Sequence, residues 1–440
     1  FYSVTGGKHF SIADNTISAE AENIIVKADT DDTWNWSAKV NNLSIEKLDN
    51  TVRKSKRGIV FEGVSGQDIF ISSANSSSIT VLLQDNPSFT IRNNSGHYID
   101  SSNTVRWSNL VFDQKQRSLS VDSFLFKPIL PRDSFINSHP FQSDYITIST
   151  GKMTLLNTDL SYYISDSIIK AGTLIAEHPV ITAYRDNLSK TFDPGHMKPL
   201  PTELVKKFPL FISLDSIYML NGTVTYSQLE KTTGMVGVVP LTDLNARLSL
   251  VRNYDLKVTD SMELNATAKL VNDISVKLVA KESYEDPLGG IRLLLNTGGT
   301  DLKKINSMLI PLISVKIKSG YADTVSMDAS ANEYLAFGQM NMRYKNLKIA
   351  ILNKGNENTK GFKTWLINFA ANTLLVKNKN TGRKGIVYFE RNRDRSFFNY
   401  LVKMFFRGMA NSVGLKIDKK KIKKHQRELK KSDKENRHTA

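Results

Sequence analysis

Residues 210–226 read Leu-Phe-Ile-Ser-Leu-Asp-Ser-Ile-Tyr-Met-Leu-Asn-Gly-Thr-Val-Thr-Tyr, with apolar-rich runs on either side of Asn221-Gly222. An Asn-Gly pair tolerates a positive φ at both positions and is typical of the tight type I′ turn that joins two antiparallel strands. Apolar residues of the first run occur at both odd and even positions and would therefore point to both faces of a strand. This predicts a strand covered to some extent on both faces. We therefore expect a β-hairpin at the centre of the chain.

A second stretch is similar to the first part of this one. Residues 148–157 align without a gap with residues 212–221 and share Ile, Ser, Leu and Asn at matching positions. A Pro and an Arg-Asp pair precede each copy: Pro128 with Arg132-Asp133, and Pro179 with Arg185-Asp186. Internal repeats are typical of architectures that grow by stacking units, so the match favours an ancestral duplication. The alternative is a chance match between two β-rich segments.

The clearest periodicity of the chain lies in residues 262–270 and 274–280, where apolar and polar residues alternate. A period of two places the apolar side chains on one face of a strand and the polar ones on the other. Short strand-like runs separated by turn residues fill most of the chain before this point, and short helices are predicted at 202–208 and 301–310. The expected fold is mainly β: an elongated, curved antiparallel sheet shaped as a groove, with a few short helices and amphipathic helices at the C-terminal end.

The positive charge is concentrated at one end. The chain carries 59 Lys+Arg and 43 Asp+Glu, a net charge of +16, and residues 360–440 hold 22 of the former and 6 of the latter. The preceding residues are therefore neutral overall, and the asymmetry predicts an anionic partner for the C-terminal end. The chain has no cysteine and no run of 18 apolar residues. It begins with Phe1 and not with Met, which indicates either a processed N-terminus or a fragment.

Four regions follow from these patterns. Residues 1–115 form a β-rich region, residues 116–360 the repeating groove region, residues 361–415 a helix-strand-helix element and residues 416–440 a lysine-rich tail, helical or disordered. In the third region a mostly apolar helix is predicted at 361–376 and a strand at 385–390. A last helix begins after Asp394 or Ser396, either of which can cap it, and runs to about residue 413.

No motif for catalysis is present. The seven histidines lack metal-ligand spacing, the Gly-Gly pairs lack the residues of a phosphate loop, and no Gly-x-Ser-x-Gly elbow occurs. Acidic residues are plentiful, but nothing marks a glycosidase pair among them. We expect no enzyme activity, no metal and no cofactor.

The apolar face needs a covering layer, and the chain has only short helices to supply one. Either a second sheet packs against it, or a curved sheet holds lipid chains in an apolar groove, since hydrophobic burial needs no specific side chains. An ordinary packed core is the third alternative. The candidate groove residues are Leu264, Ala266, Leu270, Ile274, Val276 and Leu278.

The last predicted helix has two interpretations. Its aromatic and aliphatic residues either close the end of the sheet or enter a membrane, with Lys403, Arg407 and the basic tail on anionic head groups. The candidate apolar membrane contacts are Phe397, Phe398, Leu401 and Phe405. A nucleic-acid partner is not expected, because no folded reading module accompanies the tail.

The order of several motifs resembles that of the AsmA-like family of bacterial envelope proteins, especially versions associated with Bacteroidetes. The residues that carry the resemblance are Tyr184-Arg185-Asp186, Gly195 to Leu200, Asn221 to Tyr226, Leu302 to Gly320, and Tyr388 to Tyr400. They cover about 170–415; the first 115 residues match only in β character, and the lysine tail departs from the family pattern. No active-site residue is implied.

The resemblance implies a repeating β-groove protein, anchored in the inner membrane by an N-terminal helix and extending through the periplasm. Proteins that look like this are implicated in moving phospholipids and in outer-membrane integrity. The expected function is therefore a non-enzymatic envelope protein whose partners are phospholipids and an anionic membrane surface. The alternatives are a surface β-solenoid or sandwich that binds glycan or protein as an adhesin and, more weakly, a polysaccharide-acting enzyme.

Overall fold

The computed structural model describes residues 8–12, 15–28, 34–52, 57–75, 81, 85–159, 168–191, 193, 195, 197–231, 233–352, 376–415 and 417–438. In these residues 21 strands form one sheet. The strands are β1 (Lys8–Ile12), β2 (Asn15–Ala28), β3 (Trp34–Asp49), β4 (Gly58–Ser72), β5 (Thr90–Ile99), β6 (Asn103–Asp113), β7 (Ser118–Val121), β8 (Ser123–Pro128), β9 (Asp144–Thr150), β10 (Met153–Leu156), β11 (Ile168–Glu177), β12 (Val180–Asp186), β13 (Phe211–Leu229), β14 (Val236–Arg252), β15 (Ser261–Leu270), β16 (Ile274–Ser283), β17 (Ile291–Thr297), β18 (Thr300–Asp301), β19 (Val315–Ala331), β20 (Leu335–Ile351) and β21 (Lys384–Glu390).

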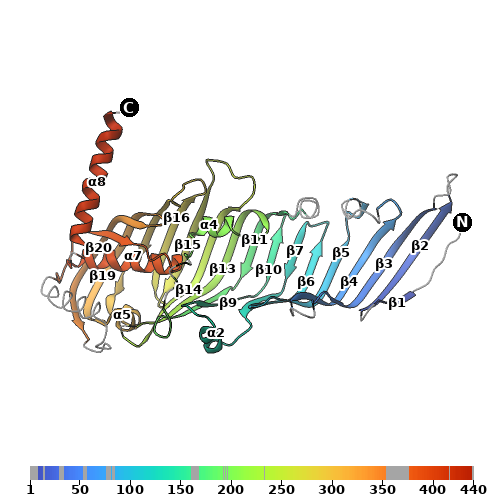
Figure 1. Cartoon of the computed structure of the whole chain (residues 1–440), viewed down its shortest axis with the longest axis horizontal. Coiled ribbons are helices and arrows are strands. Elements are labelled where there is room, and N and C mark those ends of the chain that lie inside the picture. The colour runs from blue at the N-terminus through green and yellow to red at the C-terminus, as the bar shows by residue number, and fades with distance from the viewer. Residues whose placement is uncertain are drawn as a thin grey trace.

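The strands lie side by side in chain order (Figure 1). The pairs β7 with β8, β9 with β10 and β11 with β12 each behave as one interrupted strand, because both members pair with the same neighbours. Pairing is antiparallel except that β13 runs parallel to β11 and β12. The expectation of a purely antiparallel sheet is corrected at this place. A parallel neighbour requires a long connection, and the chain between β12 and β13 supplies it.

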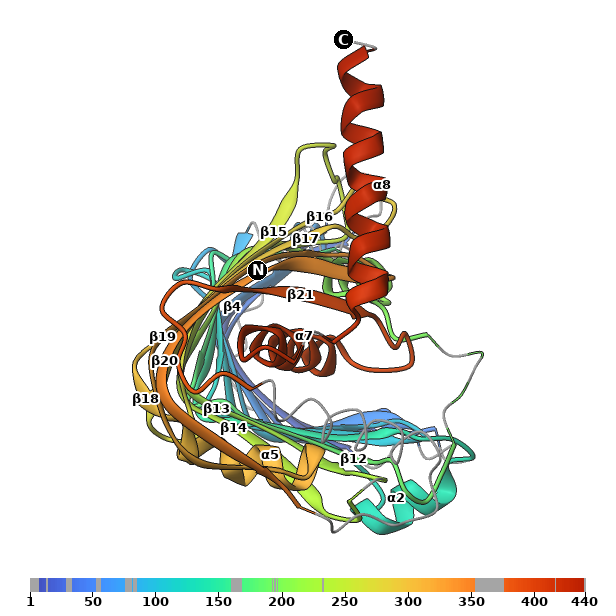
Figure 2. The ribbon, with the colours of Figure 1, turned by 90° about the vertical axis from the view of Figure 1, so that its left-hand side faces the viewer.

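A line of backbone irregularities crosses the sheet at mid-strand. Several strands between β4 and β14 have a position near their middle that departs from extended geometry or interrupts the strand, and the register places these positions beside one another. Those with positive φ are Gly63, Asn109, His178, Asn221 and Asp243. An extra residue in one strand bends and twists it, so aligned irregularities fold the whole sheet along one line. The sheet is accordingly U-shaped in cross-section (Figure 2).

Asn221-Gly222 belongs to this line and does not form a hairpin turn, so that prediction was wrong. Asn221 has φ of 52°, but β13 continues through it as one strand of 19 residues with two register shifts against β14. Neighbouring strands on both sides hold the chain extended here. A Cβ on Gly222 would lie 2.9 Å from Cγ of Pro179, so glycine allows the close approach of β12.

The two copies of the sequence repeat have only partly similar structures. Residues 148–157 span the end of β9 and all of β10, with an interruption at Gly151-Lys152, whereas residues 212–221 lie in uninterrupted β13. Asn157 and Asn221, at the end of each copy, both have positive φ. The duplication stays a prediction.

Helices contribute little to the fold. Those of the described residues are α2 (Arg132–Ser138), α4 (Pro201–Lys206), the 3-10 helix η1 (Leu302–Ile305), α5 (Asn306–Ile313), α7 (Phe397–Ser412) and α8 (Lys419–His438). The expected end of α5 at Pro311 is corrected: the helix continues to Ile313 and ends at Ser314, whose φ is 54°. Burial of Leu309 and Leu312 outweighs the hydrogen bond that proline cannot donate in the last turn.

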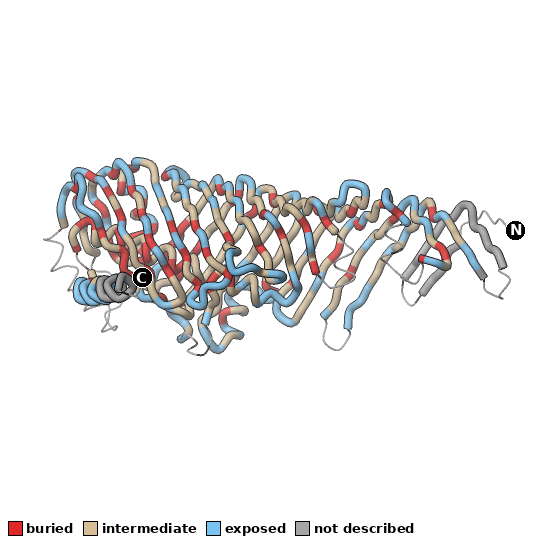
Figure 3. The backbone as a smooth tube through the Cα atoms, turned by 90° about the horizontal axis from the view of Figure 1, so that it is seen from above, coloured by how far each residue is buried: buried red, intermediate tan, exposed pale blue. Residues whose placement is uncertain are grey.

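Buried residues are dense in the C-terminal half and sparse in the N-terminal half (Figure 3). The main core cluster joins β16–β21 with η1, α5 and α7, and it includes Leu293, Met340 and Met404, none of which is exposed. The sheet continues across the expected boundary at 115/116 through the pairing of β6 with β7 and β8. The predicted helix 361–376 lies outside the described residues, apart from its last position, which the structure gives no helix.

Candidate functional site: an apolar groove that ends at α7

The inner face of the sheet is apolar on one side of the bend across almost the whole sheet. A row of direct cross-strand neighbours can be followed from β3 to β21, and every member is apolar or glycine. The row is Leu43, Gly66, Ile91, Phe112, Leu119, Leu155, Leu174, Ile217, Leu248, Leu264, Ala280, Leu293, Ala329, Gly338 and Val387.

The other side of the bend has a row of the same kind. It runs through Ile59, Tyr98, Val105, Phe126, Ile148, Ile181, Val224, Leu241, Leu270 and Ile274. On the outer face the row next to the first is mixed: Ser44, Ser65, Arg92, Val111, Ser120, Thr154, Ile175, Tyr218, Arg247 and Asn265. Since alternate side chains point to opposite faces, the U encloses an apolar groove and presents a more polar outside.

The predicted groove residues lie in the second half of this groove. Leu264, Ala266, Leu270, Val276 and Leu278 line a cavity of about 370 Å³ between the sheet and α7. All five are only partly buried. Ile274 does not line the cavity and is 4% exposed in the main core cluster.

Helix α7 lies lengthwise inside the U (Figure 2). Ser396 caps it, its hydroxyl oxygen accepting a hydrogen bond from the backbone N–H of Asn399. Phe397, Phe398, Leu401 and Phe405 line the cavity. The expectation that these four present an outward membrane-contact face is corrected: the apolar groove offers a nearer surface on which to bury them, and they point into it.

The two cations of α7 face protein groups. Arg407 forms an ion pair with Asp418 at 3.7 Å and lies over the ring of Phe389. Lys403 is partly exposed, and desolvation lowers its pKa while the charge of Glu230 opposes that shift. Arg407 is therefore paired within the protein, and Lys403 lies near the charge of Glu230.

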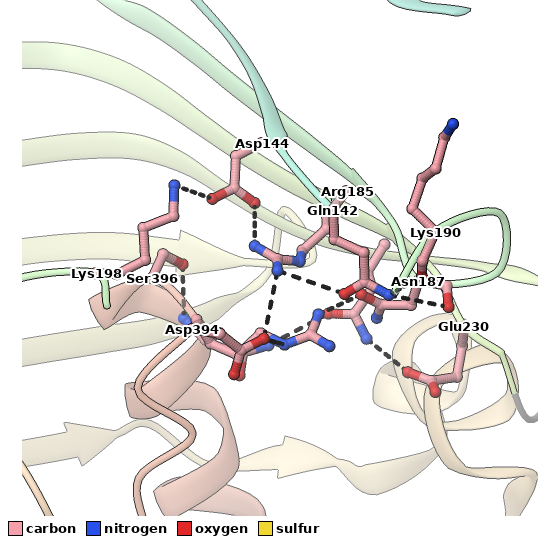
Figure 4. A network of polar contacts seen from close by, with 12 residues as sticks. Gln142, Asp144, Arg185, Asn187, Lys190, Lys198, Glu230, Asp394 and Ser396 are labelled. Atoms are coloured by element: carbon pink, nitrogen blue, oxygen red, sulfur yellow. Dashed lines mark hydrogen bonds and ion pairs between the residues drawn. The ribbon is translucent and has the colours of Figure 1, made fainter. Parts of the chain in front are cut away.

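A buried polar cluster, here called the clamp, fixes the start of α7 (Figure 4). Arg185 of β12 forms ion pairs with Asp144 of β9 at 3.1 Å and with Asp394 at 3.5 Å, and its side chain is 2% exposed. Lys198 contacts Asp144 at 3.4 Å, and Arg395 contacts Asp394 at 2.8 Å. Three segments far apart in the sequence thus meet at one lip of the groove.

The residues that lead into α7 cross to this lip from the other one. Arg391 donates its backbone N–H to the carbonyl of Tyr334, which lies in the turn before β20 on the opposite lip. The carbonyl of Arg393 accepts a hydrogen bond of 2.7 Å from the N–H of Lys198, whose own carbonyl accepts one of 2.6 Å from the Arg391 guanidinium. We call residues 391–395 the strap, because they join the two lips above the cavity.

Glu282, at the end of β16, is a buried carboxyl on the Tyr334 side of the groove. It is 3% exposed and accepts hydrogen bonds from the Thr202 hydroxyl at 2.7 Å and from the Thr202 N–H at 3.1 Å. Burial raises the pKa of Glu282 to about 7, although the bonds from Thr202 act in the opposite direction. This carboxyl therefore binds its proton more tightly in the folded protein than in the unfolded chain.

The protein is accordingly expected to lose stability as pH rises. Between the ordinary pKa of 4.5 and the folded value of about 7, the folded state holds a proton that the unfolded chain has released. The free energy of unfolding falls across this window by up to about 3 kcal/mol and is flat above it. Urea unfolding of wild type and Glu282→Gln at about pH 5 and about pH 8 tests this. A pH dependence of equal size in both proteins would contradict it.

Within the described residues no group of three or more His, Asp or Glu side chains is placed to hold a metal ion. No helix of that part of the chain combines the length and apolar character needed to cross a bilayer. Comparison of the chain with protein-family models, with curated proteins and with solved structures found no match. The AsmA-like resemblance therefore stays a prediction.

The sequence predicts part of this site. The strict alternation in β15 and β16 predicts the groove wall, but the row on β3–β13 is not predicted, because apolar and polar residues do not alternate strictly in those strands. The clamp residues Arg185 and Lys198 stand out in the sequence only as motif positions, and Asp394 as a motif position and a candidate helix cap. Asp144 and Glu282 gave no signal, since a single carboxylate in a strand is common.

Proposed function

We propose that this protein is a non-enzymatic lipid-binding protein that holds the hydrocarbon chains of phospholipids along its groove. The observation that carries the proposal is the continuity of the two apolar rows across the sheet. Inward side chains such as Leu155, Leu174 and Leu264 are only partly buried in the protein alone. Transfer of apolar surface out of water is worth about 25 cal/mol per Å², so bound chains that cover these rows are stabilised without specific contacts.

The proposed setting is the bacterial cell envelope, with the groove in the periplasm and an inner-membrane anchor preceding it. Phospholipids would be bound or conducted between membranes, in support of outer-membrane assembly and integrity. This setting rests on the resemblance of the motifs.

The basic C-terminal end is proposed to contact an anionic membrane surface. Helix α8 leaves the body as a separate arm (Figure 1). Its start is held by Ile422, which is 9% exposed, by the ring of His425 against Phe337, and by an ion pair of 2.5 Å between Lys421 and Glu390. Beyond these contacts its exposed cations are Lys419, Lys420, Lys423, Lys424 and Arg427. Each cation near an anionic surface contributes about 1 kcal/mol at moderate ionic strength.

Native mass spectrometry of the protein purified from membranes, followed by lipid extraction, tests the proposal. Several phospholipids per chain are expected, together with transfer of labelled phospholipid between vesicles. A protein without lipid that fails to transfer it would overturn the proposal.

The alternative is a glycan-binding or protein-binding adhesin. A hollow of about 1100 Å³ on the outer face favours it, since the polar side chains of Arg292, Asp328, Gln339 and Asn341 lie there among apolar ones, beside His425 of α8. This alternative predicts no bound lipid and binding to a glycan array that is lost on Gln339→Ala.

A further inference from the structure

The cavity under α7 differs from the rest of the groove in being covered by a helix. Most of its lining residues are aliphatic or aromatic, and among the described residues only Thr267 and Thr297 bring a polar side-chain atom to the lining. A polar or charged group placed there would have almost no hydrogen-bond partner, which costs free energy. A hydrocarbon segment has no such cost. With about 30 Å³ for a group the size of water or methylene, 370 Å³ holds on the order of ten such groups.

The cavity does not continue toward the C-terminal strands. Leu293, Met340, Val387 and Met404 fill the space between α7 and β17–β21, and none of them is exposed. The helix backbone almost touches the sheet at Gly408, where a Cβ would lie 2.8 Å from Cε of Met340. A chain inside the groove therefore meets a solid end at β17.

The mouth of the groove is also closed at this place. The strap joins the lips above the cavity, and the clamp fixes its far end in a cluster whose central guanidinium, on Arg185, is almost fully buried. Toward lower-numbered strands the first apolar row continues from Ile217 to Leu174 and Leu155, which are partly exposed. The cavity is thus continuous with the open groove in this direction.

We propose that the cavity is a blind pocket for the terminal methyl end of one acyl chain, and that lipid enters and leaves this part of the groove from the side of β11–β13. The proposal rests on the proposed function and adds to it the orientation of the lipid and a fixed end of the groove. The head group lies outside the pocket, and α7 is an end stop that stays in place while lipid is exchanged.

Photo-crosslinking tests the orientation. Two phospholipids are loaded onto the full chain, one with a diazirine next to the terminal methyl of an acyl chain and one with a diazirine next to the carboxyl. The first is expected to label α7 around Phe397 and Leu401 and strands β14–β16. The second is expected to label positions outside the cavity. If lipid is bound and both probes label the cavity equally, the blind pocket is contradicted but the proposed lipid binding is not. Absence of bound lipid contradicts the proposed function itself.

A reversible disulfide tests whether α7 is an end stop. In the pair Gly408→Cys with Met340→Cys, the new Cβ at 408 lies 3.1 Å from Cβ of residue 340, a few tenths of an ångström below the usual range for a disulfide. The chain has no other cysteine to compete. Oxidation is expected to leave the rate of phospholipid transfer between vesicles within about two-fold of the rate of the reduced protein, since the disulfide holds α7 where it already lies.

The single variants Gly408→Cys and Met340→Cys, treated with the same oxidant, control for effects of the substitutions. A transfer rate that falls about ten-fold or more on oxidation of the double variant, and recovers on reduction, would show that α7 moves. That result would overturn the end stop, because the groove would then open through its C-terminal end.

Discussion

Replacing Leu264 by aspartate is expected to remove most of the lipid that the protein carries. Leu264 lies in the first apolar row, between Leu248 and Ala280, and lines the cavity. A bound hydrocarbon chain would cover the new carboxylate without supplying a hydrogen bond. Burying a polar group unpaired costs about 1–3 kcal/mol or more, so lipid affinity is expected to fall about ten-fold or more. Quantitative lipid extraction and vesicle-to-vesicle transfer measure the loss.

Asn265→Asp is the matched control, because it adds the same charge one residue away on the exposed outer face. It is expected to leave bound lipid and transfer unchanged. Leu278→Asp, on the neighbouring strand of the cavity wall, is expected to behave like Leu264→Asp, which separates loss of binding from a local folding defect at one position. Equal loss from the inward and outward variants would mean that the apolar face does not hold lipid.

Replacing Arg185 by alanine is expected to cost more stability than any exposed ion pair of the protein. The substitution leaves Asp144, whose side chain is 6% exposed, with Lys198 as its remaining cation, and it cuts the link from Asp394 to the sheet. Removing one partner of a buried pair costs about 3–5 kcal/mol, because the other charge stays buried. Urea unfolding measures the total loss, and amide exchange is expected to show early opening of α7 and the strap.

Lys281→Ala is the control for this loss. Its ion pair with Glu263 has a distance of 2.7 Å, but both side chains are about half exposed, so its removal is expected to cost less than about 1 kcal/mol. The double variant Arg185→Met with Asp144→Leu is expected to recover much of the stability, since it removes both main charges and fills their place with apolar groups. An Arg185→Ala variant as stable as Lys281→Ala would show that the clamp does not hold α7.

The sequence by itself determined the fold class and one wall of the groove. The alternation of apolar and polar residues in β15 and β16 predicts an apolar strand face without knowledge of the neighbouring strands, because the side-chain period of a strand is a local property. The strand at the end of the sheet and helix α7 with its Ser396 cap also followed from local signals. The tight turn at Asn221-Gly222 was predicted from equally local chemistry and was wrong, since a positive φ suits a bulge as well as a turn. Paired strands on both sides of β13 decide between the two.

The tertiary structure alone decided where the apolar faces meet and which way α7 points. The cross-strand rows depend on register, and the aligned irregularities that fold the sheet into a U appear in the sequence only as scattered Asn, Asp, His and Gly residues. An amphipathic helix presents the same apolar side to a membrane and to a groove, so sequence could not choose between them. Burial against β20 and β21, together with the pairing of Arg185 with Asp144 and Asp394, makes the choice. These contacts join residues far apart in the sequence, 209 positions in the case of Arg185 and Asp394.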